Sequence, residues 1–286
     1  MSFKNTPIPA AAEAAGMTKL VFADDFDSYD TIDMSGEGKP GYLWYADRPY
    51  SNPTLTKEDL VIKDSVVTIR PERAGAAVGM PTYSRKGQTG FVYNKGYAEA
   101  RMRFPVSGLG EVKSGQIPAF WALGVDDVMG RPWNHIGELD ILEAVHAHQI
   151  DNAVIYTGTL HDHNRLEGPP TKLCTNTINA TGYQDQFDVL DDDWHTYAAL
   201  WDENYVAWYL DNKLMHSARY ADGELPQYFY RDDPTPLPPA EEVFPNYGRP
   251  AWPGAHTIMN TDKMVLFISG HRDWPVDVDW VRVWQK

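Results

Sequence analysis

The chain has 286 residues, of which 43% are hydrophobic and 13% aromatic, enough apolar material for one large domain or two small ones. Its 40 aspartates and glutamates outnumber 25 lysines and arginines, which gives a net charge of -15. This charge argues against nucleic acid, an anionic membrane or a sulfated polymer as a partner and is compatible with a neutral substrate. The single cysteine, Cys174, excludes an internal disulfide, so packing must stabilise the fold.

Residues 1–18 are expected to form a mobile tail ahead of a single domain that spans residues 19–286. The tail does not resemble a secretory signal, because Glu13 interrupts its alanine run and no long apolar stretch follows Lys4. Nowhere does the sequence hold an apolar run of about 18 residues, the length that a transmembrane helix needs.

From residue 20 onward the sequence consists of short segments of period two, the pattern of half-buried strands. Residues 61–69 and 208–214 each indicate a hairpin around a short polar turn, and residues 97–104 place small or apolar side chains on one face. The last segment, residues 276–284, alternates valine and tryptophan with aspartate and arginine. Many short strands in one chain of this length predict an all-β sandwich or jelly roll.

Residues 222–254 depart from this pattern, because prolines recur through the stretch with tyrosine, phenylalanine and tryptophan between them. A loop of this length in a compact domain is usually functional or disordered. The aromatic side chains favour an ordered loop that packs on the body of the domain.

The densest cluster of reactive groups is formed by Glu138, Asp140 and Glu143. On a regular strand Glu138 and Asp140 share a face, whereas Glu143 points to the other face. A β-bulge between Asp140 and Glu143 would bring all three carboxylates to one face. Hydrolysis of a glycosidic bond needs such a set, with one carboxylate to attack and another to protonate the leaving oxygen.

A helix is the alternative for this segment. Ile136, Leu139, Leu142 and Val145 are spaced by three residues, which is typical of a surface helix with solvated acids on its other side. The local pattern leaves both structures open.

The six residues 138–143 resemble the E-x-D-x-x-E signature of glycoside hydrolase family 16, in the bulged form of its laminarinases, agarases and carrageenases. Further segments resemble the family's other motifs in the same order, and they span the chain from about residue 20 to its end: residues 22–27, 89–95, 97–101, 118–121, 159–161, 194–197 and 278–283.

The resemblance implies a β-jelly-roll sandwich of two bent antiparallel sheets with a concave glycan cleft. It also implies a retaining endo-glycosidase that hydrolyses internal β-linkages of a neutral polysaccharide by double displacement. Glu138 would be the nucleophile, Asp140 its assistant and Glu143 the general acid and base. No cofactor is required, although a structural calcium is familiar in the family.

β-1,3-Glucan is the first substrate that we expect, with agar or another β-galactan as the alternative. The alternative arises because Phe91, Ile117 and residues 264–274 depart from the laminarinase pattern. A non-catalytic glycan-binding jelly roll is the competing class, but binding alone has no need of the three acids. We expect a monomer whose partner is the polysaccharide, secreted or periplasmic with its signal outside this sequence, with a cytoplasmic location as the alternative.

Three further residues are predicted to contact sugar. Trp133 and Trp121 lie in the family's motifs, and aromatic planes stack on the apolar faces of sugar rings. His161 closes a T-L-H segment that resembles the family's own. A metal-dependent enzyme similar to the cupins is a weaker alternative, in which Glu143 and two H-x-H pairs, His146 with His148 and His161 with His163, would bind the ion.

Overall fold

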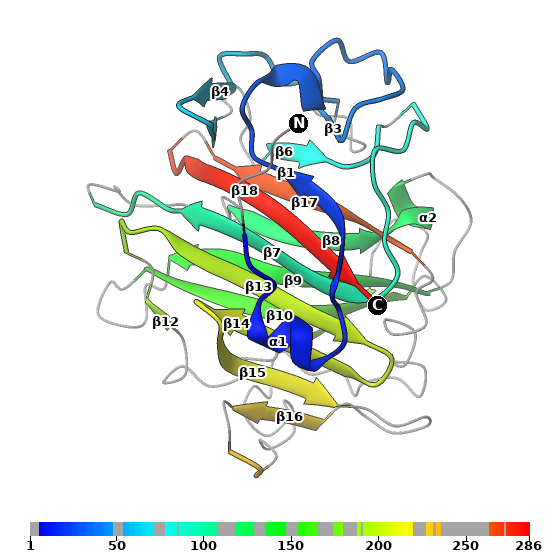
Figure 1. Cartoon of the computed structure of the whole chain (residues 1–286), viewed down its shortest axis with the longest axis vertical. Coiled ribbons are helices and arrows are strands. Elements are labelled where there is room, and N and C mark those ends of the chain that lie inside the picture. Colours follow the sequence, from blue (N-terminus) through cyan, green and yellow to red (C-terminus); the bar gives the residue numbers. More distant parts are fainter. Residues whose placement is uncertain are drawn as a thin grey trace.

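The computed structural model describes residues 6–47, 54–70, 78–84, 86–107, 118–128, 135–146, 154–164, 174–179, 188–189, 191–219, 227–230, 233–235, 263–271 and 273–286. In this part of the chain two antiparallel sheets lie one on the other (Figure 1). The prediction of an all-β sandwich is therefore confirmed.

The first sheet, here called the large sheet, has nine strands within the described residues. In spatial order they are β16 (Gln227–Tyr230), β15 (Lys213–Arg219), β14 (Tyr205–Leu210), β13 (His195–Asp202), β7 (Gly96–Arg103), β18 (Val276–Gln285), β5 (Val66–Ile69) and β4 (Leu60–Lys63), with β1 (Lys19–Asp24) also paired to β18.

The second sheet, the small sheet, has seven strands in the same part of the chain. Their order is β11 (Cys174–Asn179), β10 (Val154–Asn164), β9 (His135–His146), β8 (Ala119–Gly124), β17 (Met264–Gly270) and β6 (Val78–Pro81), with β12 (Asp188–Val189) paired to β10. The remaining elements are a short parallel pair and three short helices: β2 (Ile32–Asp33), β3 (Trp44–Tyr45), α1 (Ala10–Ala14), η1 (Tyr29–Thr31) and α2 (Val125–Val128).

Both predicted hairpins are present, and their turns explain their sequences. Asp64 and Ser65 join β4 to β5 with φ of 52° and 55°, and Asp211 and Asn212 join β14 to β15 with φ of 49° and 63°. Two-residue turns with positive φ at both positions match the twist of the strands they connect, and short polar side chains tolerate that conformation best. The predicted strands at residues 97–104 and 276–284 correspond to β7 and β18.

The expectation of a mobile tail at residues 1–18 is wrong for the part that the structure describes. The described part of the predicted mobile tail holds α1, and Ala12 and Met17 are fully buried against Tyr97 and Trp284 on the outer face of the large sheet. This packing stabilises a helix that is too short to form alone. Within the predicted loop at residues 222–254, Gln227–Tyr230 form strand β16, which pairs with β15 and extends the large sheet. Most of the stretch lies outside the described residues, so the ordered loop stays a prediction.

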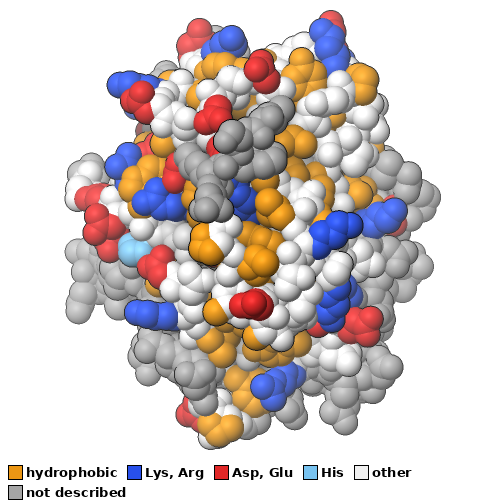
Figure 2. All heavy atoms as spheres, viewed as in Figure 1, with side chains coloured by type: hydrophobic (Ala, Val, Ile, Leu, Met, Phe, Trp, Pro, Cys, Tyr) orange, Lys and Arg blue, Asp and Glu red, His pale blue; other side chains and the backbone are white. Residues whose placement is uncertain are grey.

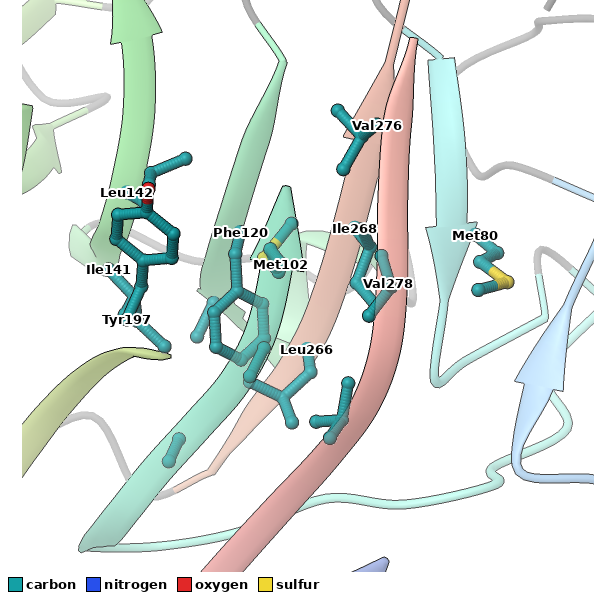
Figure 3. Packing of buried hydrophobic residues seen from close by; sticks show 14 of the residues in the cluster. Met80, Met102, Phe120, Ile141, Leu142, Tyr197, Leu266, Ile268, Val276 and Val278 are labelled. Carbon is teal, nitrogen blue, oxygen red and sulfur yellow. The ribbon is translucent and has the colours of Figure 1, made fainter. Parts of the chain in front are cut away.

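The main core fills the space between the two sheets. Phe120, Leu266 and Ile268 of the small sheet face Met102 and Val278 of the large sheet there (Figure 3). All five side chains are fully buried. Because every second residue of these strands enters the core, the alternate residues of the small sheet remain available on its other face.

Beside the apolar patch under α1, the outer face of the large sheet carries ion pairs. Arg101 bonds to Asp279 at 2.7 Å, and the buried Arg282 is paired with the buried Asp25. Acidic and basic side chains are interspersed over this face (Figure 2). None of the helices in the described ranges is long and apolar enough to cross a membrane.

Candidate active site

Strand β9 carries a bulge in the middle of the acidic motif. Along β10 the pairing moves from Thr157–Glu143 directly to Thr159–Asp140, so two residues of β9 lie opposite one residue of β10. The pairing of β9 with β8 shifts at the same place. An extra residue of this kind bends the strand and changes the face to which the following side chains point.

The bulge moves Glu143 onto the face of Glu138 and Asp140. Ile141 and Leu142 are consecutive, yet both are buried in the core between the sheets. Figure 3 shows both beside Tyr197 of β13. The alternation of β9 is thus reset by one residue. The predicted bulge is confirmed, and the helical alternative for this segment is wrong.

Asp140 lies between the two glutamates in sequence, and both of them influence its carboxyl group. Its side chain is only 2% exposed, whereas Glu138 and Glu143 are half-buried. Burial raises the pKa of the Asp140 carboxyl well above its usual range, and the negative charge of Glu138 raises it further. A hydrogen bond with the Glu143 side chain opposes both effects. The Asp140 carboxyl therefore keeps its proton to a higher pH than an exposed aspartate does.

Trp121 of β8 lies beside Asp140 in the register of the small sheet. Its half-buried ring stacks on Phe267 of β17, with 4.2 Å between ring centroids and 16° between the planes. Its Nε1 donates a hydrogen bond of 3.2 Å to the Ser269 hydroxyl. These contacts fix one face of the indole and leave part of the side chain open at the acidic motif.

Phe267 and Ser269 are site residues that sequence reasoning missed. They lie in a segment singled out only for its departure from the laminarinase pattern. The signal that could have found them is the alternation of β17, which puts both residues on the face that carries Trp121.

Thr157 and Thr159 of β10 border the acids on the opposite side from Trp121. They are the register partners of Glu143 and Asp140 and are 7% and 3% exposed. The acids are therefore bordered on the β10 side by closely packed polar side chains.

The structure describes the other predicted sugar-contacting residues, His161 and Trp133, only in part or not at all. His161 of β10 is the register partner of Glu138, and its contact with sugar stays a prediction. Trp133 lies outside the described residues. Among the side chains that the structure describes, no group of three or more His, Cys, Asp and Glu residues could hold a metal ion. The four histidines of the H-x-H alternative have side chains that the structure does not describe. That alternative stays a prediction, as does the structural calcium.

The sequence matches the family model described as Glycosyl hydrolases family 16 over residues 52–238, a range that includes the whole acidic motif. The chain belongs to this family. It is 24% identical to the keratan-sulfate endo-1,4-beta-galactosidase of Sphingobacterium multivorum over 98% of this chain and 61% of that relative. It is 26% identical to the endo-1,3-1,4-beta-glycanase EglC of Rhizobium meliloti (strain 1021) over 69% of this chain and 42% of that relative.

A solved member of the family shares the fold. The laminarinase catalytic domain from Thermotoga maritima MSB8 superposes with a TM-score of 0.50 at 19% identity, covering 94% of this chain and 98% of that one. The sandwich is thus the jelly roll of family 16, as the resemblance implies. The matched part of this chain covers 61% of the length of the first curated relative and 42% of the second, so it spans only part of each.

Proposed function

We propose that the protein is a retaining endo-glycosidase that hydrolyses internal β-linkages of a neutral polysaccharide. The observation that carries the proposal is the bulge in β9, which brings Glu138, Asp140 and Glu143 to one face of the small sheet. Two carboxyl groups about 5–5.5 Å apart are what retention requires, one as nucleophile and the other as acid and then base. The bulge supports this assignment because it puts two glutamates of one strand on the same face of the sheet.

In the first step the Glu138 carboxylate attacks the anomeric carbon, while Glu143 gives its proton to the glycosidic oxygen. The carbon–oxygen bond breaks, the chain end leaves as an alcohol, and a glycosyl ester forms on Glu138. In the second step Glu143 takes a proton from water, the resulting oxygen attacks the same carbon, and the ester bond breaks. Glu138 is released as a carboxylate and Glu143 is protonated again.

Asp140 supports this cycle by keeping a proton beside an ionised Glu138. Three carboxylates this close cannot all ionise together, and the buried one gains most from remaining neutral. When Glu138 becomes an ester its charge disappears, and the pKa of Asp140 falls with it. The proton on Asp140 therefore follows the charge of the nucleophile through the reaction.

β-1,3-Glucan is the first substrate that we propose. The net charge of -15 favours a neutral polymer, and the indole of Trp121 offers an apolar plane beside the acids. The relatives include an endo-1,3-1,4-beta-glycanase. β-Galactan is the second candidate, because the keratan-sulfate endo-1,4-beta-galactosidase is similar over 98% of this chain.

The test is the release of reducing sugar by the wild type and by Glu138→Gln from laminarin, lichenan, agarose and carrageenan. We expect activity on laminarin or agarose that falls to background in Glu138→Gln while binding to the polymer persists. Glu203→Gln, at an exposed glutamate, is the matched control and should remain active. Turnover by Glu138→Gln would overturn the nucleophile assignment. Binding without hydrolysis by the wild type would favour the non-catalytic class instead.

A further inference from the structure

Trp208 of β14 reaches across the core to the acidic motif. Its side chain is 1% exposed and lies between the two sheets. The indole Nε1 donates a hydrogen bond of 2.8 Å to the backbone carbonyl of Asp140, a residue 68 positions away in the sequence. Carbonyls in a regular ladder point sideways to neighbouring strands, so a donor from the facing sheet meets one most readily where a bulge interrupts the ladder.

The packing around Trp208 is tight on the β10 side. A Cβ on Gly158 of β10 would lie 2.4 Å from Cδ1 of Trp208, 2.5 Å from its Nε1 and 2.9 Å from Nε2 of His216. Gly158 is the residue of β10 that faces the extra residue of the bulge. Glycine is therefore required there, because any side chain would push the indole away from Asp140.

His216 of β15 packs against the indole. Its ring centroid lies 4.8 Å from that of Trp208, with 32° between the planes. A shift in the pairing of β14 with β15 places His216 directly opposite Trp208. Burial lowers the pKa of His216 to about 3, so the ring stays neutral and adds no charge beneath the acids. The large sheet thus carries its own irregularity under the bulge of the small sheet.

We propose that Trp208 is a positioning residue, whose hydrogen bond to the Asp140 carbonyl holds the β9 bulge in the register that aligns Glu138, Asp140 and Glu143. The inference rests on the proposed glycosidase function. The indole N–H is a donor only, on a rigid ring, so it fixes both the direction and the distance of the carbonyl. Misplacing catalytic groups by about 1 Å costs about 100-fold in rate, which makes this bond a determinant of turnover.

Trp201 provides a matched control in the next strand of the same sheet. It is also 1% exposed, packs in the same core and lies on β13. Within the described residues its Nε1 has no hydrogen-bond partner. Replacing either tryptophan with phenylalanine removes the same atoms from the same core. Only at Trp208 does the replacement also remove a hydrogen bond to strand β9.

The experiment compares Trp208→Phe with Trp201→Phe in steady-state kinetics on the polymer that the wild type hydrolyses. We expect Trp208→Phe to lower kcat about 10- to 100-fold with KM nearly unchanged, whereas Trp201→Phe should keep kcat within about twofold. Equal kcat values for the two variants would overturn the proposal. If Trp208→Phe does not fold, β-(3-benzothienyl)alanine at position 208 keeps the ring shape and lacks only the N–H donor, and the same comparison applies.

A second readout needs no substrate and so separates this inference from the proposed function. Carboxyl resonances of ¹³C-labelled Asp and Glu are followed against pH in the wild type and in both variants. Loss of the Trp208 bond should change the titration of Asp140, and Trp201→Phe should leave it as in the wild type. An Asp140 titration unchanged in Trp208→Phe would contradict the positioning role even if the polymer is never identified. A wild type that hydrolyses nothing, with Asp140 shifted in Trp208→Phe, would overturn only the proposed function.

Discussion

Burying the carboxyl group of Asp140 beside Glu138 is energetically unfavourable. A carboxyl group that is 2% exposed loses most of its hydration, and its neighbour Glu138 adds a like charge. A protein under selection for stability alone would place an apolar side chain here. The cost is consistent with a site whose function depends on the proton that burial retains.

The raised pKa of Asp140 makes its effect on stability depend on pH. Below the ordinary value of 3.8 the carboxyl is protonated in both the folded and the unfolded chain, and no penalty arises. As the pH rises above 3.8, the unfolded chain releases the proton while the folded protein retains it. The unfolded state is favoured progressively until the folded pKa is passed, so the wild type loses stability over this range.

Asp140→Asn removes this loss, because an amide keeps the shape and does not titrate. We expect the free energy of unfolding of Asp140→Asn to exceed that of the wild type by more at pH 7 than at pH 4. Its kcat should fall about 100-fold, since no proton can then be shared with Glu138. Urea unfolding at the two pH values checks the first expectation. Asp193→Asn, at an exposed position, is the control, and an equal difference at both pH values would contradict the argument.

At the scale of single elements, the bulge of β9 was the feature best predicted from sequence. The spacing of Glu138, Asp140 and Glu143 demands an extra residue if the three acids are to share a face, and the structure has that extra residue. The support from Trp208 could not be predicted in this way. It joins residues 68 positions apart, and an isolated tryptophan in a strand indicates only burial.

The short elements α1 and β16 could not be predicted from the sequence for a different reason. α1 has five residues, fewer than a helical period needs to be visible in a sequence, and it depends on the large sheet beneath it. β16 has four residues in a stretch rich in proline, so turn signals outweigh the strand pattern. Both elements pack on or extend the large sheet, and neither contributes a side chain to the acidic motif.

Met17→Ala tests whether the segment around α1 is part of the folded domain. Met17 is fully buried against the outer face of the large sheet, so its truncation should lower the free energy of unfolding by about 2 kcal/mol or more. The kcat should stay near that of the wild type, because the acids lie on the other sheet. Leu20→Ala is the control, since Leu20 is 43% exposed and should change stability by less than about 0.5 kcal/mol. Equal, small effects would indicate that the segment is not packed in solution.

At the scale of the whole molecule, the net charge of -15 bears on which polymer can approach. A field of this sign repels an anionic chain over roughly a Debye length, about 10 Å at 0.1 M salt and about 30 Å at 0.01 M. A neutral glucan or galactan is indifferent to the field. The charge therefore bears on the choice between an uncharged substrate and a sulfated one, such as the polymer named for the Sphingobacterium multivorum relative.

The salt dependence of kcat/KM makes this distinction measurable. On laminarin or agarose we expect kcat/KM to change less than about twofold between 0.01 and 0.2 M sodium chloride, because no long-range charge interaction exists to screen. On keratan sulfate or carrageenan any activity should be weakest at 0.01 M and rise with salt, as the repulsion between enzyme and polymer is screened. Activity on a sulfated polymer that is highest at 0.01 M would contradict this expectation. The field near the acids would then be positive in spite of the net charge, and a sulfated galactan would replace the neutral glucan as the proposed substrate.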